Sequence, residues 1–144
     1  MTYIELESAV IKTSSALAKR GLQANDVVLL ISNNFIEVPV AFFSVWKAGG
    51  CCACLTLNLF VEDIRSRAQE VGAKFVVTDE PHAKKVVEAV RDLNCVQEVF
   101  VIGQADGCTP FHDLMDNDSQ GNTTKNLKNS NNFKESKIIS KISF

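Results

Sequence analysis

The 144-residue sequence has few of the residues that commonly mark a catalytic or membrane-spanning segment. It holds one Trp, one Tyr, two His and three Pro, and its seven Gly form neither G-x-G-x-x-G nor G-x-x-x-x-G-K-[ST]. These two patterns bind dinucleotide and nucleoside triphosphate phosphates, so neither kind of glycine loop is expected. The longest apolar runs are too short or too interrupted to span a bilayer. A net charge of −2 does not favour nucleic acid as a partner.

A secretory signal is also missing from the start of the chain. Met1 is followed by TYIELESAV, which has no apolar core region of the kind that signal peptides carry. Five Cys in a chain without such a signal favour reduced thiols in a reducing compartment. We therefore expect an intracellular protein, and the sequence leaves open whether its compartment is cytoplasmic, peroxisomal or mitochondrial.

Charge divides the chain into two parts. Residues 1–118 hold 10 Lys+Arg against 16 Asp+Glu, a balance of −6, whereas residues 119–144 hold five Lys and one Glu, a balance of +4. The second part also contains five Asn and five Ser and has no sustained hydrophobic periodicity, which is typical of disorder. The sequence predicts a folded unit over 1–118 and a disordered tail over 119–144.

Helix and strand patterns alternate through the first part. Helices are expected between Thr2 and Gly21, over 35–48, 62–71 and 81–93, and strands over 27–31, 51–57, 74–78 and 99–102, before a short helical turn in PFHDLM. Strands that alternate with helices through short connections form right-handed crossovers. The predicted fold class is α/β, a doubly wound, mostly parallel sheet of about four strands with helices on both faces.

Three of the five Cys stand in KAGGCCACLTLN, residues 47–58. Cys51 and Cys54 have the C-x-x-C spacing of zinc ligands and redox pairs. On a strand, however, Cys52 and Cys54 share one face and Cys51 points to the other, so the two sulfurs of the motif diverge. The remaining two cysteines are single residues in other segments. We interpret the run as small apolar core residues and predict no metal site there.

The other candidate groups do not form a catalytic constellation. A general base needs a neighbour within hydrogen-bond reach, and no nucleophile lies near His82 or His112 in a recognisable pattern. We predict that both histidines are solvated surface residues. The acidic pairs Glu62–Asp63 and Asp79–Glu80 are interpreted as favourable charges at helix starts. No catalytic, cofactor-binding or metal-ligating residue is therefore predicted.

The opening TYIEL, the pair Arg20-Gly21 and the run Lys47-Ala48-Gly49 follow one another in the order and spacing of a known family. On these and further positions, residues 2–118 resemble the acyl-adenylate-forming superfamily of AMP-dependent acyl-CoA synthetases. The opening TYIEL resembles the T-Y-x-E-L that begins a helix in these enzymes, and 96–118 is closest to the branch of 4-coumarate–CoA ligase and luciferase. One departure is Asn58-Leu59, where many members carry Asn-Pro. The other matching positions are Arg20-Gly21, Asp26-Val27-Val28, Asn34, Glu37, Phe42, Lys47-Ala48-Gly49, Glu62-Asp63-Ile64 and Gly72-Ala73-Lys74.

The resemblance implies an ATP-dependent acid–CoA (acid–thiol) ligase. Its members use ATP and Mg²⁺ to convert a carboxylic acid into an acyl-adenylate and pass the acyl group to coenzyme A (CoA). Their phosphate loop, acyl pocket, adenine-binding motif and catalytic lysine lie downstream of the region matched here. We therefore expect a fragment, from a truncated product or gene model, that binds none of these cofactors and is inactive by itself.

Two alternatives stay open. The first is a non-catalytic binding or dimerisation half-domain that self-associates through an apolar face left exposed. The second is an independent flavodoxin-like or receiver-like domain, which four strands and the lack of phosphate-binding glycines disfavour.

Overall fold

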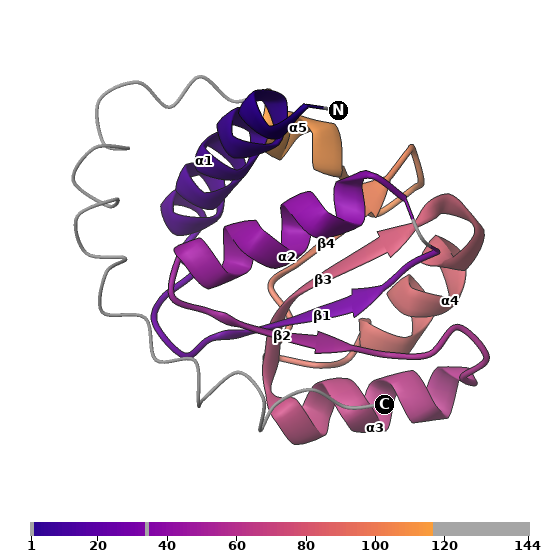
Figure 1. Cartoon of the computed structure of the whole chain (residues 1–144). Coiled ribbons are helices and arrows are strands. Elements are labelled where there is room, and N and C mark those ends of the chain that lie inside the picture. The colour runs from indigo at the N-terminus through magenta and orange to yellow at the C-terminus, as the bar shows by residue number, and fades with distance from the viewer. Residues whose placement is uncertain (1, 34, 117–144) are drawn as a thin grey trace.

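A computed structural model of the chain describes residues 2–33 and 35–116 (Figure 1). The predicted tail at 119–144 lies outside the described residues, as does Asn34. The elements in chain order are α1 (Tyr3–Lys19), β1 (Val27–Ile31), α2 (Glu37–Lys47), β2 (Cys51–Cys54), α3 (Val61–Val71), β3 (Ala73–Asp79), α4 (Glu80–Val90), β4 (Glu98–Ile102), β5 (Thr109–Pro110) and α5 (Phe111–Met115).

The strands form one parallel sheet in the order β2-β1-β3-β4-β5. This arrangement confirms the doubly wound α/β fold, although the described residues contain five strands and the prediction was about four. The prediction missed β5 because two residues, one of them Pro110, form no apolar run. The order is that of flavodoxin-like sheets, so strand order alone does not exclude the flavodoxin-like alternative.

Helices cover both faces of the sheet. Helices α1, α2 and α5 pack on one face, and α3 and α4 pack on the other (Figure 1). Side chains of β1 alternate between the two layers, with Val28 and Leu30 on the α1–α2 side and Leu29 on the α3–α4 side. All five residues of β1 are buried, which explains why VVLLI is apolar throughout. None of the helices in the described ranges is long and apolar enough to cross a membrane.

The cysteine run forms a strand, as predicted, and this strand lies at one edge of the sheet. Cys52 belongs to the core under α1 and α2, with Cys54 packed against it, while Cys51 belongs to the core under α3 and α4. The strand is shorter than the predicted 51–57. After Cys54 a single further bond, from Leu55 N–H to the carbonyl oxygen of Leu30 at 3.0 Å, continues the pairing with β1.

Two consecutive glycines let β2 start directly behind α2. Gly49 has a φ of +88°, which side chains of L-residues rarely adopt. A Cβ on Gly50 would lie 2.9 Å from Val45 Cγ1 and 3.1 Å from the carbonyl oxygen of Asp26. The turn therefore has no room for a side chain at its second position.

Burial of the cysteine strand predicts low thiol reactivity. Burial raises the pKa of the Cys52 thiol far above its ordinary value, and the neighbouring Cys54 and Cys51 thiols raise it further. Because the thiolate is the reactive form, we expect iodoacetamide to leave Cys52 unmodified in the native chain at mildly alkaline pH. Cys51 should also stay unmodified, because its side chain is buried and the reagent cannot reach it. In urea the same residues should be labelled. Mass spectrometry of the digested protein measures this, and native labelling at the denatured rate would contradict the assignment.

Acidic or hydroxyl side chains begin several helices. Thr2 Oγ1 accepts the Glu5 N–H at 3.2 Å while Glu5 Oε2 accepts the Thr2 N–H at 2.9 Å, a reciprocal capping box. Asp63 Oδ2 accepts the Phe60 N–H at 3.1 Å at the start of α3. Asp79 is the N-cap of α4. The acidic pairs therefore lie at helix starts, as the sequence predicted.

The predicted bounds of the second and fourth helices are wrong. The second helix begins at Glu37 and not at Phe35, and its N-cap is Ile36, whose side chain makes no capping bond. The fourth helix extends over Glu80–Val90 in place of 81–93. The buried Asp79 accepts the N–H of His82, the third residue of the helix. The helix therefore begins at Glu80, one residue before the predicted start at Pro81.

Candidate functional site

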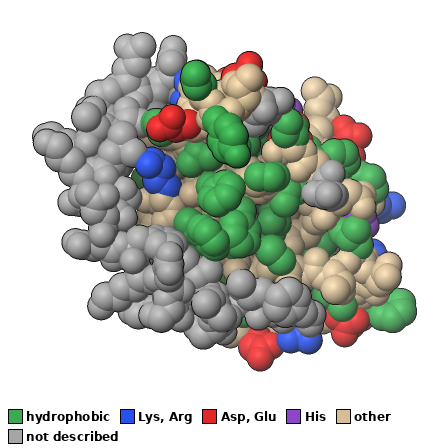
Figure 2. Space-filling view, viewed as in Figure 1, with side chains coloured by type: hydrophobic (Ala, Val, Ile, Leu, Met, Phe, Trp, Pro, Cys, Tyr) green, Lys and Arg blue, Asp and Glu red, His purple; other side chains and the backbone are tan. Residues whose placement is uncertain are grey.

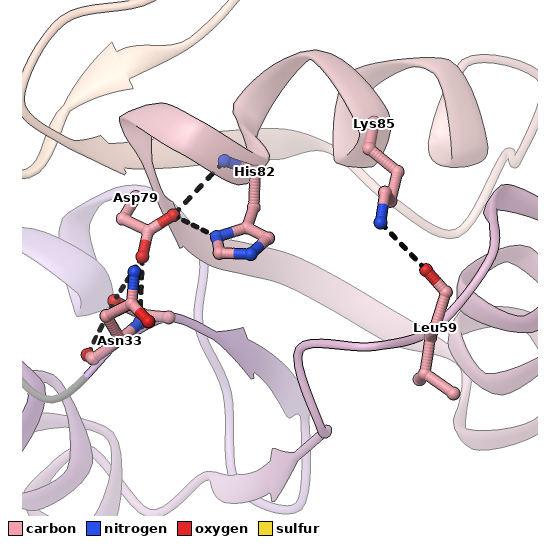
Figure 3. A network of polar contacts seen from close by, with 6 residues as sticks. Asn33, Leu59, Asp79, His82 and Lys85 are labelled. Atoms are coloured by element: carbon pink, nitrogen blue, oxygen red, sulfur yellow. Dashed lines mark hydrogen bonds and ion pairs between the residues drawn. The ribbon is translucent and has the colours of Figure 1, made fainter.

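Polar side chains meet at the carboxyl edge of the sheet, where β1 and β3 end. The strand order runs from β1 to β2 in one direction and from β1 to β3 in the other. In doubly wound sheets, the crevice outside this reversal is the usual place for a ligand. Ser32 and Asn33 follow β1 and Asp79 ends β3, so these residues and their partners define the candidate site (Figure 3).

Asp79 is at the centre of this site and is fully buried, with 0% exposure. Its Oδ2 atom accepts the Asn33 N–H at 2.8 Å and lies 3.5 Å from Ser32 Oγ. Its Oδ1 atom accepts the His82 N–H at 3.2 Å and lies 2.5 Å from His82 Nδ1. Figure 3 shows the carboxylate between the loop after β1 and the first turn of α4. One side chain thus joins two segments that are 46 residues apart in sequence.

Opposing effects set the pKa of Asp79. Burial raises it, whereas the Asn33 N–H, the His82 ring and the His82 N–H lower it. The lowering effects are larger together, so the pKa of Asp79 lies below the ordinary value of 3.8. The carboxylate is therefore ionised at neutral pH, and hydrogen bonds compensate for its loss of water.

The prediction that His82 is a solvated surface residue is wrong. Its side chain is 17% exposed and its Nδ1 atom contacts Asp79. The sequence signal that was missed is the D-x-x-H spacing, because an N-cap carboxylate reaches the residue three positions later. His112 differs, since its side chain is 54% exposed and its Nε2 atom lies 3.4 Å from Glu37 Oε1. The surface prediction is confirmed for His112.

Helix α4 also holds two other loops at this edge. Lys85 Nζ donates to the carbonyl oxygen of Leu59 at 3.0 Å, which fixes the loop between β2 and α3 (Figure 3). Glu80 Oε1 accepts the Gln104 N–H at 2.7 Å, which fixes the loop after β4. The first turns of α4 therefore bind the loops that follow β1, β2 and β4.

These residues do not fit a nucleotide phosphate or a Mg²⁺ ion. A phosphate site needs free backbone N–H groups, but the Asn33 and His82 N–H groups already donate to Asp79, whose charge repels an anion. No group of three His, Cys, Asp or Glu side chains across 2–33 and 35–116 is placed to hold a metal ion. The site is a clamp between loops, and we assign it no catalytic step.

Comparison with known proteins places this fold in a family. The family model described as AMP-binding enzyme matches residues 1–136. The chain belongs to the AMP-binding enzyme family. This membership confirms the family that the sequence motifs indicated.

Relatives of this AMP-binding family member are much longer than the chain itself. 4-Coumarate–CoA ligase 3 of Oryza sativa subsp. japonica is 30% identical over 116 residues, which are 79% of this chain and 20% of the ligase. The nonribosomal peptide synthetase otaB of Aspergillus carbonarius is 29% identical over 112 residues, 78% of this chain and 6% of the synthetase. A benzoate CoA ligase structure from Burkholderia xenovorans LB400 shares the fold, with a TM-score of 0.73 at 23% identity over 81% of this chain and 23% of that one. The chain thus spans about a fifth of the ligases it matches.

Proposed function

We propose that this chain supplies α/β scaffold to an ATP-dependent acid–thiol ligase and does not form an acyl-adenylate by itself. The observation that carries the proposal is the family match over 1–136 in a chain that covers only 20% of a related ligase. The clamp at the carboxyl edge supports it, because Asp79 takes up the backbone N–H groups that a phosphate would need. In this proposal ATP, Mg²⁺ and CoA are bound by parts of a full-length ligase that this 144-residue sequence does not contain.

The proposal specifies a reaction class and leaves the acid open. The names of the relatives include 4-coumarate and benzoate as acids and a peptide synthetase in place of a CoA ligase. The shared chemistry is the activation of a carboxylate by ATP and its transfer to a thiol, as the family resemblance implies. The chain's own role in that chemistry is to hold a parallel sheet against which further structure packs.

Carboxylate-dependent exchange between ATP and pyrophosphate tests this proposal. We expect the purified 144-residue chain to show background exchange with 4-coumarate or benzoate in the presence of Mg²⁺. Full-length 4-coumarate–CoA ligase 3 from rice, assayed in parallel, is the positive control. An acid-dependent signal that stays with the chain through two independent purifications would contradict the proposed inactivity. A His82→Gln variant should give the same background, because the clamp is structural.

A further inference from the structure

Three loops at the carboxyl edge of the sheet are held by the start of α4. The loop after β1 is bound by Asp79, the N-cap of α4, the loop after β4 by Glu80, and the loop after β2 by Lys85. These side chains come from one short stretch of sequence, whereas the backbone atoms that they bind lie in three separate segments. A change in this stretch of helix can therefore reach all three loops.

The first turn of α4 depends on Asp79 for its cap. The turn opens with Glu80, Pro81 and His82, and the His82 N–H donates to Asp79 Oδ1 at 3.2 Å. Pro81 has no N–H to donate. Because the first N–H groups of a helix have no partner within it, the turn frays when its cap is released. The turn thus has two states, one capped and one frayed.

Glu80 belongs to this turn and is packed against the loop after β4. Its Oε1 atom accepts the Gln104 N–H at 2.7 Å. The neighbouring Gly103 has a φ of +114°, and a Cβ there would lie 2.5 Å from Glu80 Cγ and 2.6 Å from Glu80 Cδ. Position 103 therefore has no room for a side chain while Glu80 keeps its place. Fraying of the turn moves Glu80 and removes its hold on this loop.

Lys85 lies in the second turn of α4, further from the cap. Its Nζ atom donates to the carbonyl oxygen of Leu59 at 3.0 Å, and Leu59 packs against the core under α3 and α4. Ala83 and Val86, on either side of Lys85, are buried. Packing holds this part of the helix as well as hydrogen bonds, so the loop after β2 should respond less to the state of the first turn.

We propose that the first turn of α4 is a coupling element. When the turn frays, the loops after β1 and β4 open together, and the loop after β2 follows to a smaller extent. Coupling between two sites requires an element with two states that both sites bias, and the capped turn meets this requirement because Asp79 and Glu80 each bind a different loop. The inference goes beyond the proposed ligase role, which gives the chain a scaffold role only.

The coupled loops lead to opposite faces of the sheet. The loop after β1 continues into α2, over which hydrophobic side chains gather on the surface (Figure 2). The loop after β2 continues into α3 on the other face. A contact that draws the loop after β1 away from Asp79 should therefore also loosen the loop after β4, which a different side chain holds.

Amide hydrogen exchange of the full chain, measured residue by residue with NMR, tests the coupling. Glu80→Ala removes the acceptor of the Gln104 N–H, so exchange at Gln104 should become faster. Exchange at His82 and Asn33 should also rise, by at least about fivefold, which is the lower end of typical coupling between sites. The N–H groups of these two residues donate to Asp79, which the substitution leaves in place.

Two controls separate coupling from a general loss of stability. Val77 lies in β3 with 1% exposure, so its amide reports global unfolding, and the rates at the other amides are compared with its rate. Glu88→Ala makes the same change at an exposed position of α4 and should leave exchange at Asn33 unchanged. Glu80→Gln, which keeps an acceptor oxygen, is a milder variant in case Glu80→Ala is unfolded, and its effect at Asn33 should be smaller.

The coupling should also act in the reverse direction. Asp79→Ala should speed exchange at Gln104, whose N–H binds Glu80 and not Asp79. Phe60 follows Leu59 in the loop after β2, and its amide should respond less than that of Gln104.

Three results would overturn the proposal. If Glu80→Ala speeds exchange at Gln104 alone, the loops open independently. If it speeds exchange equally at Asn33, Gln104 and Val77, the chain unfolds as a whole and the turn has no separate role. If Asp79→Ala leaves Gln104 unchanged, the reverse coupling is missing. None of these results alters the ATP–pyrophosphate exchange assay, which tests the ligase role separately.

Discussion

Replacing Phe100 by alanine is expected to lower the free energy of unfolding by about 3–5 kcal/mol. The Phe100 side chain has 0% exposure and lies in the core between the sheet and α1, α2 and α5. Its ring packs against Phe75 with centroids 5.6 Å apart, and the Arg20 guanidinium carbon lies 5.4 Å from the ring centre. Alanine removes the aromatic contact, the cation–π contact and most of the buried apolar area, and it leaves a cavity that the sheet cannot close.

Urea unfolding followed by far-UV circular dichroism measures this loss. Phe60→Ala is the control, because Phe60 is 74% exposed and should change stability by no more than about 0.5 kcal/mol. Phe100→Leu is a milder variant in case the alanine variant is unfolded at neutral pH. A loss below about 1 kcal/mol at Phe100→Ala would show that the two aromatic rings do not form the core described here.

Replacing Asp79 by alanine is expected to destabilise the chain by about 2–3 kcal/mol. The substitution removes the helix N-cap and leaves the Asn33 N–H, the His82 N–H and His82 Nδ1 without their acceptor. The loop after β1 then loses its link to the first turn of α4, so the amide protons of this loop should exchange faster with solvent. Hydrogen exchange at Asn33 distinguishes this local loosening from a general loss of stability. An unchanged exchange rate there would contradict the clamp.

The clamp also predicts a pH dependence with a definite sign. Because the folded pKa of Asp79 lies below the ordinary 3.8, its ionised form stabilises the fold fully at higher pH. That contribution is lost as pH falls through the folded pKa. Asp79→Asn keeps an acceptor oxygen but cannot titrate, so the stability difference between parent and variant reports the ionised Asp79 carboxylate. It should shrink once pH falls below about 4, and a difference that stays constant to lower pH would contradict the assignment.

The alternation of strands and helices could be predicted because it depends on residues that are close together in sequence. VVLLI is apolar throughout because β1 is covered on both faces, and the run CCAC places its thiols on two faces because strand side chains alternate. The β5 strand could not be predicted, since Thr109 and Pro110 become a strand only through pairing with Phe100 and Val101. Pairing of that kind is a tertiary effect with little local signal.

Only part of the candidate site could be predicted from the sequence, for the same reason. Asp79 was predicted to start a helix, and that part depends on residues next to it in sequence. Its bond to Asn33 crosses 46 positions and exists only after β1 and β3 lie side by side. His82 becomes half-buried only through that assembly, so a surface histidine was the natural expectation from sequence. The apolar stretch in α2 could be recognised in the sequence, but only the structure shows that part of it is exposed.

The position of β1 in the sheet has a consequence for synthesis of the chain on the ribosome. β1 is hydrogen-bonded to β2 on one edge and β3 on the other, and β3 ends only at Asp79. A nascent chain that has released residues up to Cys54 holds two paired strands at most, which is too few for a stable sheet in water. At roughly 5–20 residues per second, translation of the next 25 residues takes about one to five seconds. Throughout that interval VVLLI has one unpaired edge, so a chaperone that recognises extended apolar segments should bind the growing chain there and release it once β3 has emerged.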